Sequence, residues 1–380
     1  MKKNKKISMV LLFSILSILL GIGIGSVWIS PEEIIRVLVY KILQFPLPEW
    51  FSPIHIGLVW NIRLPRVFLA FLVGAALAVS GTVMQSVLMN PLASSYGLGV
   101  SSGAGLGVIL VMMSGASSGI LGIFLLPVVG LLSGLLTVIL AIAIASRLDR
   151  NLSNYTIILT GMVLSLFINA IMSTLASSSS KYAQRITLWQ LGSFSMKEWS
   201  YVVVLFPIVI GCILFFMRYA NEMDIMTFGE EQALSMGIDL KKTKWILIGL
   251  TAALTGTAVA FVGIIGFVDL IAPHVVRRFF GSSHKFVIPM SALFGGSFMV
   301  LVDILARTLV SPSEIPIGSI TALVGAPFFI YVYPCLLFFQ ICPKNYAMAA
   351  GQLFHERMEL CSGAFPNRDW LHPLFHEICK

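Results

Sequence analysis

Residues 64–88 read LPRVFLAFLVGAALAVSGTVMQSVL, and this stretch decides the class of fold. A helix needs about 20 mostly apolar residues to cross the hydrocarbon core of a bilayer, and this run is long enough. Its one charged residue is Arg66, near its start. A helix that is apolar on every side must be surrounded by protein or by lipid. The stretch therefore predicts a membrane span.

The composition of the whole chain agrees with this prediction. Of its 380 residues, 57% are hydrophobic and 11% are charged, whereas soluble domains carry about 25% charged residues. The net charge of +8 does not indicate nucleic-acid binding, because excess Lys and Arg in a membrane protein mark its cytoplasmic loops. The chain is therefore predicted to be an all-α polytopic membrane protein.

The N-terminal apolar run, Ile7–Ile29, follows four lysines and has two interpretations. It is too long for the core of a signal peptide and lacks a clear cleavage site, so we expect a first span. Pro31–Leu43 is expected to form a short helix outside the membrane. Further spans are expected at 64–88, 95–113, 119–145, 154–176, 200–219, 244–263, 266–280, 286–304 and 316–333. The pair at 244–280 is so tight that one of its members must be short or broken.

An inside N-terminus places more Lys and Arg on the cytoplasmic side than outside, as the positive-inside rule requires. Eight cationic residues then fall on the outside and need a separate explanation: Arg36, Lys41, Arg63, Arg66, Lys181, Arg185, Lys197 and Arg307.

Two patterns raise the question of catalysis or proton transfer. Gly99-Val-Ser101-Ser-Gly103 matches a nucleophile elbow, but such an elbow needs a preceding strand, and close helix packing explains the glycines better. Asp269, Asp303 and His274 could form a proton relay, since ionisable groups inside a membrane are functional candidates. The alternative is that Asp303 pairs with Arg307, four residues later, while Asp269 and His274 lie at the boundary of a span.

The most informative polar segment of the chain is 218–244, which is longer than a short loop needs. Its glycines and acidic residues favour a short helix at about 229–236, between two spans on the cytoplasmic face. Such a helix is either a solvated loop element or a docking surface for a cytoplasmic partner. The chain contains no Gly-x-x-x-x-Gly-Lys-Ser/Thr sequence, so it has no phosphate-binding loop of its own.

Several ordered motifs together closely resemble the permeases of iron-siderophore, haem and cobalamin importers, the type II ABC importers. They run from about residue 63 to residue 330. The motifs are Arg63-Leu-Pro-Arg66, Val73–Gly81, Met84-Gln85, Asn90-Pro-Leu-Ala93, Leu98–Ala104, Gly229–Gly237, Gly263–Val268, Ala272-Pro-His274, Asp303-Ile-Leu-Ala-Arg307, Glu314–Gly318 and Gly325–Phe329.

The resemblance implies a ten-helix permease of the bacterial cytoplasmic membrane, with both termini cytoplasmic and helices two to five related to helices seven to ten as an inverted repeat. It implies a permease homodimer or heterodimer, ATPase subunits that bind ATP and Mg²⁺, and an extracytoplasmic substrate-binding protein. The chain itself would be no enzyme and would bind no cofactor or metal. The expected substrate is an iron chelate, a ferric siderophore or haem. The alternatives are cobalamin, or a proton-coupled secondary carrier that uses Asp269 and Asp303.

The resemblance also assigns residues to roles. Arg63, Arg66 and Arg307 would meet carboxylates of the binding protein, for which planar guanidinium groups are suited. The turn from Asn90 to Leu92 matches a cytoplasmic gate. The coupling helix, which would fit a cleft in the ATPase, would use Gly229, Glu230, Glu231, Ala233, Leu234 and Gly237.

Three features depart from the family pattern. Asp269 stands where glycine is expected, and Ser94-Ser95-Tyr96 replaces a stretch that is often acidic. The permease domain is expected to end at residue 333, because Tyr331-Val-Tyr-Pro334 should break the last helix. Residues 334–380 form an atypical tail, either a real extension or a frameshifted end. A zinc site there would use His372 and His376 with Cys361 or Cys379, a looser spacing than usual.

Overall fold

The apolar runs fold as helices in the computed structural model of the chain. Every regular element in the described part of the chain is helical. The described residues are 3–25, 27–45, 53–115, 120–149, 152–177 and 180–341.

Ten helices among the described residues correspond to the ten predicted spans. Seven of them are long and apolar enough to cross a membrane. α13 is one of the short ones, as the tight spacing at 244–280 required. The ten are α1 (Lys3–Gly23), α4 (Leu64–Val87), α5 (Val100–Met113), α6 (Ile120–Leu148), α7 (Asn154–Ser177), α9 (Trp199–Arg218), α12 (Leu240–Val262), α13 (Val268–Phe280), α14 (His284–Thr308) and α15 (Ile317–Ile341).

Shorter helices connect the spans. α2 covers Pro31–Leu43, as predicted, and begins with a capping box in which Ser30 and Glu33 bind each other's backbone N–H groups. The backbone N–H of Ser30 holds the pKa of Glu33 below its ordinary value. The others are α3 (Pro53–Gly57), the π-helix η1 (Leu58–Arg63), the 3₁₀-helix η2 (Ser95–Leu98), α8 (Ser180–Gln190), α10 (Ala220–Met226) and α11 (Glu230–Ser235).

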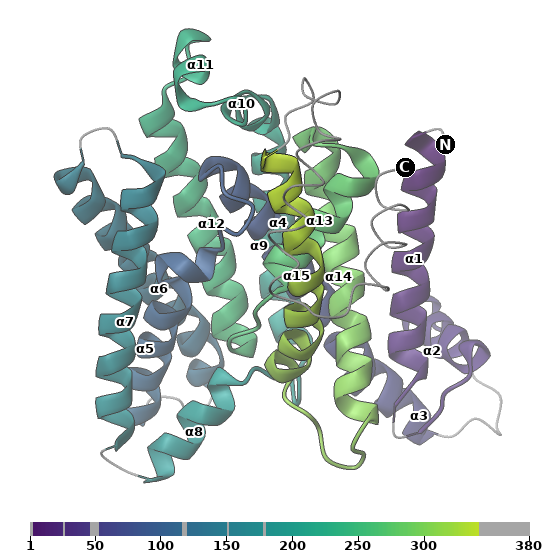
Figure 1. The fold of residues 1–380 in the computed structure, drawn as a ribbon. Helices are drawn as coiled ribbons and strands as arrows, with labels where there is room; N and C mark the ends of the chain where they lie inside the picture. Colours follow the sequence, from purple (N-terminus) through teal and green to yellow (C-terminus); the bar gives the residue numbers. More distant parts are fainter. Residues whose placement is uncertain are drawn as a thin grey trace, which may run out of the picture. The chain divides into compact units, whose positions relative to one another are not determined.

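The connecting elements gather at two opposite ends of residues 1–325. α10, α11 and the start of α1 lie at one end, here called the α11 end, whereas α2, α3 and α8 lie at the other, the α2 end (Figure 1). The cationic residues of the α11 end include those at the starts of α1, α12 and α14 and at the ends of α6, α9 and α13. They are Lys5, Lys6, Arg147, Arg218, Lys241, Lys242, Lys244, Arg277, Arg278 and Lys285.

Two sets of four helices repeat one pattern in opposite directions. α4 to α7 have 24, 14, 29 and 24 residues, and α12 to α15 have 23, 13, 25 and 25. α4 begins at the α2 end, but α12 begins at the α11 end (Figure 1). This is the arrangement expected of the inverted repeat.

α4 is the central helix and is buried over almost its whole length. It packs against α9, α12, α13 and α14. Gly74 on α4 and Gly295 on α14 let the two backbones touch, since a Cβ on Gly295 would come within 2.7 Å of the Gly74 carbonyl oxygen. Small residues permit such close approaches between membrane helices.

A Gly295→Val substitution is expected to lower the free energy of unfolding in detergent by about 1–3 kcal/mol, because the added methyl groups overfill this contact. Thermal unfolding followed by tryptophan fluorescence measures the loss. Gly211→Val on α9 is the matched control, since a Cβ at Gly211 would meet no atom of another element within 4 Å. Equal losses in the two variants would contradict the importance of the contact.

The end of α15 corrects one prediction. The helix continues through Tyr331 and Pro334 to Ile341, so the prediction that this segment breaks it is wrong. A proline removes one backbone hydrogen bond, and membrane helices tolerate this loss. The chain divides into two compact units, residues 1–325 and 326–380, and the described part of the second is the latter half of α15.

Candidate docking and coupling sites

Arg63 stands where η1 passes into α4 and closes the end of α1. Its guanidinium donates to the carbonyl oxygens of Ile22 at 2.7 Å and Gly23 at 2.8 Å, and also to that of Val27. The last carbonyls of a helix lack intrahelical partners and attract a cation. Arg63 is therefore buried as a cap on α1, and only 3% of it is exposed.

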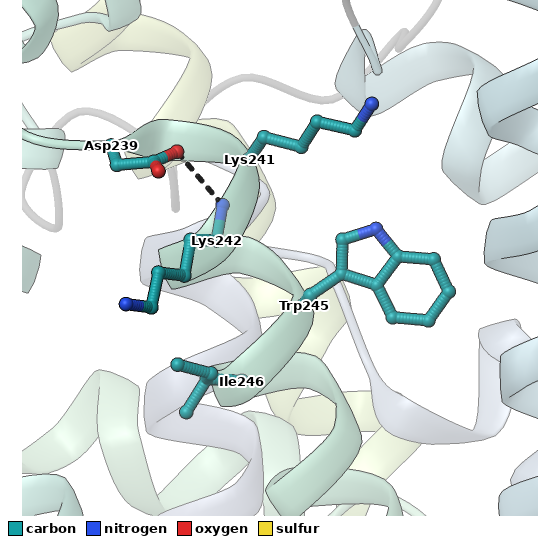
Figure 2. A pocket seen from close by; sticks show the side chains of 5 residues that line it. All are labelled: Asp239, Lys241, Lys242, Trp245 and Ile246. Atoms are coloured by element: carbon teal, nitrogen blue, oxygen red, sulfur yellow. Dashed lines mark hydrogen bonds between the residues drawn. The ribbon is translucent and has the colours of Figure 1, made fainter.

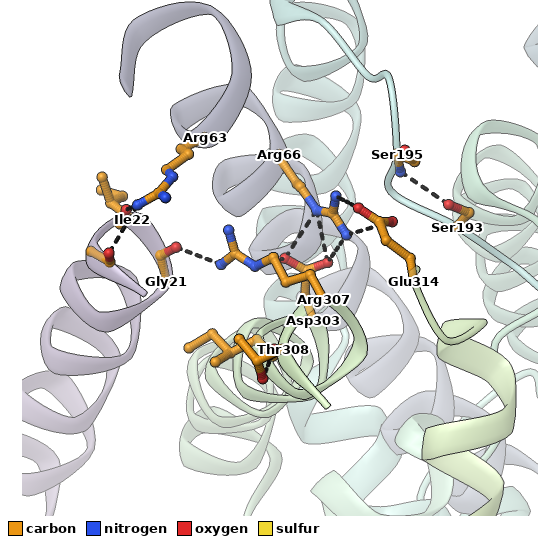
Figure 3. Close-up of polar contacts among 12 residues, drawn as sticks. Gly21, Ile22, Arg63, Arg66, Ser193, Ser195, Asp303, Arg307, Thr308 and Glu314 are labelled. Atoms are coloured by element: carbon orange, nitrogen blue, oxygen red, sulfur yellow. Dashed lines mark hydrogen bonds and ion pairs between the residues drawn. The ribbon is translucent and has the colours of Figure 1, made fainter. Parts of the chain in front are cut away.

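Arg66, one turn further along α4, binds two carboxylates that lie far away in sequence. Its Nε and one terminal nitrogen donate to Asp303 Oδ1 at 2.9 and 2.8 Å. Its terminal nitrogens also donate to Glu314 at 2.6 and 3.1 Å. This two-sided grip ties α4 to α14 and to the loop before α15 (Figure 3).

Arg307 completes the group that we call the outer arginine cluster: Arg63, Arg66, Asp303, Arg307 and Glu314. Its Nε lies 3.4 Å from Asp303 Oδ2, so the predicted pairing within α14 is present. A terminal nitrogen donates to the Gly21 carbonyl oxygen at 2.5 Å. Three guanidinium groups against two carboxylates leave the cluster one net positive charge.

The three arginines predicted for docking are thus brought together at the α2 end, but each already has partners within the chain. Glu314 is the most exposed member of the cluster, with 36% of its side chain accessible. It belongs to one of the sequence motifs but had no predicted role of its own. No local pattern could have paired it with Arg66, because the two are 248 residues apart.

At the opposite end, the predicted coupling helix is present as α11. Gly229 precedes it with φ 119°, and Gly237 follows it with φ 83°, conformations that favour glycine. Glu230, in its first turn, accepts a hydrogen bond of 2.9 Å from Lys244 of α12. Lys244 also donates to the Leu152 carbonyl oxygen at 3.1 Å. α11 is therefore bound to α12, and Lys244 links both to the loop before α7.

Three large apolar side chains project from α11 and its flanks, and we call them the α11 surface. They are Phe228 with 69%, Leu234 with 58% and Met236 with 63% of the residue exposed. Ala233, also assigned to the coupling helix, is fully buried and so lies away from this surface. It faces inward because it lies on the side of this short helix that packs against the core.

The predicted gate residues form the turn that ends α4. Asn90 donates its backbone N–H to the Gln85 carbonyl oxygen at 3.1 Å. Its side-chain oxygen accepts from the backbone N–H of Leu92 at 2.9 Å, an Asx turn. Leu92 is exposed beyond this turn. The turn is thus rigidly attached to the end of α4.

The other candidate residues are separated by the fold. Ser101 lies in the first turn of α5, on a helix that follows no strand, so the elbow geometry is lacking. Asp303 is held by Arg66 and Arg307 in the outer arginine cluster. Asp269, in the first turn of α13, accepts a hydrogen bond from Ser94.

Both departures from the family pattern, at 94–96 and at 269, therefore meet at one place. His274 lies further along α13. The residues of the possible zinc site in the tail, Cys361, His372, His376 and Cys379, lie outside the described residues.

A shallow pocket of about 530 Å³ opens at the start of α12 (Figure 2). Lys241, Lys242, Trp245 and Ile246 line it together with Asp239, whose carboxylate accepts from the backbone N–H of Lys242 at 3.0 Å. Lysines together with a tryptophan are typical of the border between lipid and water.

Comparison with known proteins now identifies the class. The chain belongs to the FecCD transport family, whose model matches residues 11–334. It is 37% identical over 290 residues to the cobalamin import system permease protein of Halobacterium salinarum, covering 76% of each chain. It is 36% identical over 285 residues to the hemin transport system permease protein of Yersinia pestis, covering 73% of this chain and 83% of the relative.

A solved structure supports the same fold. It is an inward-facing conformation of a metal-chelate type ABC transporter, with a TM-score of 0.76 and 30% sequence identity. The match covers 87% of this chain and 99% of the other. The chain is therefore a multi-pass membrane permease with the fold of the ABC importers that the sequence motifs resemble.

Proposed function

We propose that this protein is the permease subunit of a binding-protein-dependent, ATP-driven importer of a metal chelate in the bacterial cytoplasmic membrane. The α11 surface carries the proposal: it exposes three large apolar side chains at the polar, basic end of the chain. Such a patch at a membrane protein's aqueous end indicates a site for a protein partner. The expected partner is the ATPase that supplies the energy, with its ATP and Mg²⁺.

The proposed substrate is an iron chelate, either a ferric siderophore or haem. The relatives support the broader class of a metal held in a large organic ligand, since one is named for hemin and another for cobalamin. Cobalamin is accordingly the alternative substrate. Uptake of radiolabelled ferric siderophore, haem and cobalamin by membrane vesicles would distinguish them.

A second permease subunit is proposed to face α7. This helix is apolar enough to cross a membrane, yet it exposes Asn169, Ser173 and Thr174 in its latter half. Before its last residue, Arg218, the exposed positions of α9 are apolar by contrast, as lipid requires, for example Val203, Phe206 and Leu214. Polar groups on a membrane helix usually face protein or water. We therefore place the substrate pathway between two copies of α7, or between α7 and a related subunit.

The orientation follows from charge. The α11 end collects the cationic residues named above, so it is proposed to be cytoplasmic, with both termini on that side. The α2 end then faces the substrate-binding protein. There the outer arginine cluster offers one net positive charge to carboxylates on that partner.

The structure changes how docking should be tested. Replacing the arginines would remove the hydrogen bonds that hold α1, α4 and α14 together, as well as removing positive charge. Glu314→Gln is sharper, because it removes an exposed competitor for Arg66 and raises the net charge of the cluster. We expect the variant to bind the substrate-binding protein roughly tenfold more tightly at low salt, a change of about 1.4 kcal/mol.

Surface plasmon resonance at two salt concentrations would measure this change. Glu32→Gln is the matched control, since Glu32 is an exposed carboxylate on α2 that pairs with Arg36 at 2.5 Å. Weaker binding of the Glu314→Gln variant would contradict a role of the cluster in docking.

The function as a whole is tested by purifying the chain from its native membrane in mild detergent. We expect an ATPase subunit to co-purify and the complex to hydrolyse ATP. The rival is a proton-coupled carrier that uses Asp269 and Asp303. A chain that purifies alone, with uptake that stops with a protonophore and ignores ATP depletion, would replace the importer by this carrier.

A further inference from the structure

A carboxylate on α10 forms the cap of a helix that is distant in sequence. Asp224 accepts the backbone N–H of His284, the first residue of α14, at 2.8 Å. Ser283 also donates its hydroxyl to Asp224, at 3.3 Å. The local cap position, Ser283, makes no side-chain cap bond of its own. The start of α14 is therefore held by α10 rather than by its own sequence.

The ring of His284 extends this contact into the protein. Its Nδ1 lies 2.5 Å from Asp224 Oδ1, and its Nε2 lies 2.5 Å from Ser86 Oγ on α4. A carboxylate only accepts hydrogen bonds, so Nδ1 carries a proton toward Asp224. Nε2 pairs with the Ser86 hydroxyl, which also donates to the Thr82 carbonyl oxygen at 2.9 Å. The ring is buried and bridges α10 to the last turn of α4.

A third helix, α13, binds the same turn of α4. Arg277 donates to Ser86 Oγ at 3.0 Å, to the Thr82 carbonyl oxygen at 3.2 Å and to Gln85 Oε1 at 2.7 Å. Gln85 in turn donates from its side chain to the Asp269 carbonyl oxygen at 3.3 Å. The end of α4 is therefore gripped by polar groups from α13 and α14.

These contacts link the two sites that the proposed function connects, the α11 surface and the turn from Asn90 to Leu92, here called the gate turn. On one side, α10 is separated from α11 by three residues, and it packs against α4 and α14 with Met223 and Met226 buried. On the other side, the Asx turn of Asn90 follows directly after the end of α4. Asp224, His284 and Ser86 thus form a continuous series of contacts from α10, which precedes the α11 surface, to the gate turn.

We propose that Asp224, His284 and Ser86 form a coupling joint, which transmits displacement of α10 and α11 to the end of α4 and so to the gate turn. The inference rests on the proposed function, because a partner ATPase must move α11. These are positioning residues that touch neither nucleotide nor substrate. Arg277 holds the α4 side of the joint, so that the turn moves as one unit with the helix.

The joint can transmit movement because its hydrogen bonds stiffen the contact of α10 with α4 and α14. α10 is a short helix, and apolar contacts alone would let it slide over α4 and α14. Hydrogen bonds from one buried ring, to Asp224 of α10 and to Ser86 of α4, fix the position of α10 in a way that packing does not, because hydrogen bonds are directional. Without the joint, α11 would still bind its partner and follow it, but α4 would no longer follow α11.

The test measures movement at the gate and needs no knowledge of the substrate. Leu92→Cys is introduced into a chain whose own cysteines are replaced by serine. The chain is purified with its ATPase subunits. The rate of labelling of Cys at this position by N-ethylmaleimide is compared in the nucleotide-free complex and in the complex trapped with ATP and vanadate. In the parent we expect the two rates to differ by about fivefold or more, the lower end of couplings between distant sites.

Asp224→Asn and His284→Asn are then made separately in this parent. Each is expected to reduce the ratio of labelling rates to about one, while ATP hydrolysis and co-purification of the ATPase are retained. Asp239→Asn is the matched control at the same end of the chain. That carboxylate also caps a helix, α12, at 3.0 Å, but it has no bond to α4, so this variant should keep the ratio of the parent.

Three results would overturn the joint. The first is a parent complex with equal labelling rates in its two states. The second is an unchanged ratio in both joint variants. The third is loss of assembly in both variants, which would assign the residues to stability alone. The absence of a co-purifying ATPase is a different result, because it refutes the proposed function before any joint variant is made.

Discussion

An Asp303→Ala variant is expected to lose about 3–5 kcal/mol in free energy of unfolding, the usual effect of removing one partner from a buried ion pair. Asp303 is completely buried and contacts both Arg66 and Arg307. Its removal takes the carboxylate from both of these arginines and leaves three guanidinium groups with Glu314 as the remaining carboxylate of the cluster. Unfolding of the purified protein in detergent by heat or denaturant measures the loss.

Glu32→Ala is the control for this prediction. It also removes a carboxylate from an arginine at the α2 end, but this pair is exposed and spans one helical turn. Such pairs contribute about 0.3–0.5 kcal/mol. A loss from Asp303→Ala no larger than that of the control would mean that the outer arginine cluster does not hold α4 to α14.

The second large effect is expected at the α11 surface. Phe228→Glu combined with Leu234→Glu should abolish co-purification of the ATPase and ATP-dependent uptake. Each apolar anchor of an interface contributes about 2 kcal/mol or more, so losing two lowers affinity roughly a thousandfold. Quantitative immunoblotting of the ATPase after purification, with uptake by intact cells, measures both outcomes.

Met196→Glu is the control for this pair, because Met196 is a fully exposed apolar residue in the loop between α8 and α9. That loop lies toward the α2 end and cannot reach a partner at α11. Retention of the ATPase by the α11 variant would show that the partner binds elsewhere.

The helices and their order were predictable because the signals are local. Apolar runs set the spans, and Pro31 with Ser30 and Glu33 set the start of α2. Gly229 and Gly237 likewise bounded α11. Each of these features depends on residues within a few positions of one another.

The contacts that make the candidate sites were beyond such reasoning. Arg66 and Asp303 are 237 residues apart, and His284 is 60 residues from Asp224. Motifs placed Arg66 and Asp303 at the same end, but gave no sign that each would bind the other. The sequence also could not show which side of α11 is buried, because a six-residue helix is too short for its periodicity to reveal the inward face.

The first helix of the chain has its main packing partner near the end of the sequence. α1 packs against α14. Ser297 donates to the Ser14 hydroxyl at 2.9 Å across 283 residues, and Lys6 donates to the Phe279 carbonyl oxygen at 2.6 Å. During synthesis, α1 therefore enters the bilayer long before its partner exists. Until α14 leaves the ribosome, the serine-bearing side of α1 must be in contact with lipid or with an insertion factor. Nascent chains stalled before residue 284 should thus remain attached to the insertion machinery through α1.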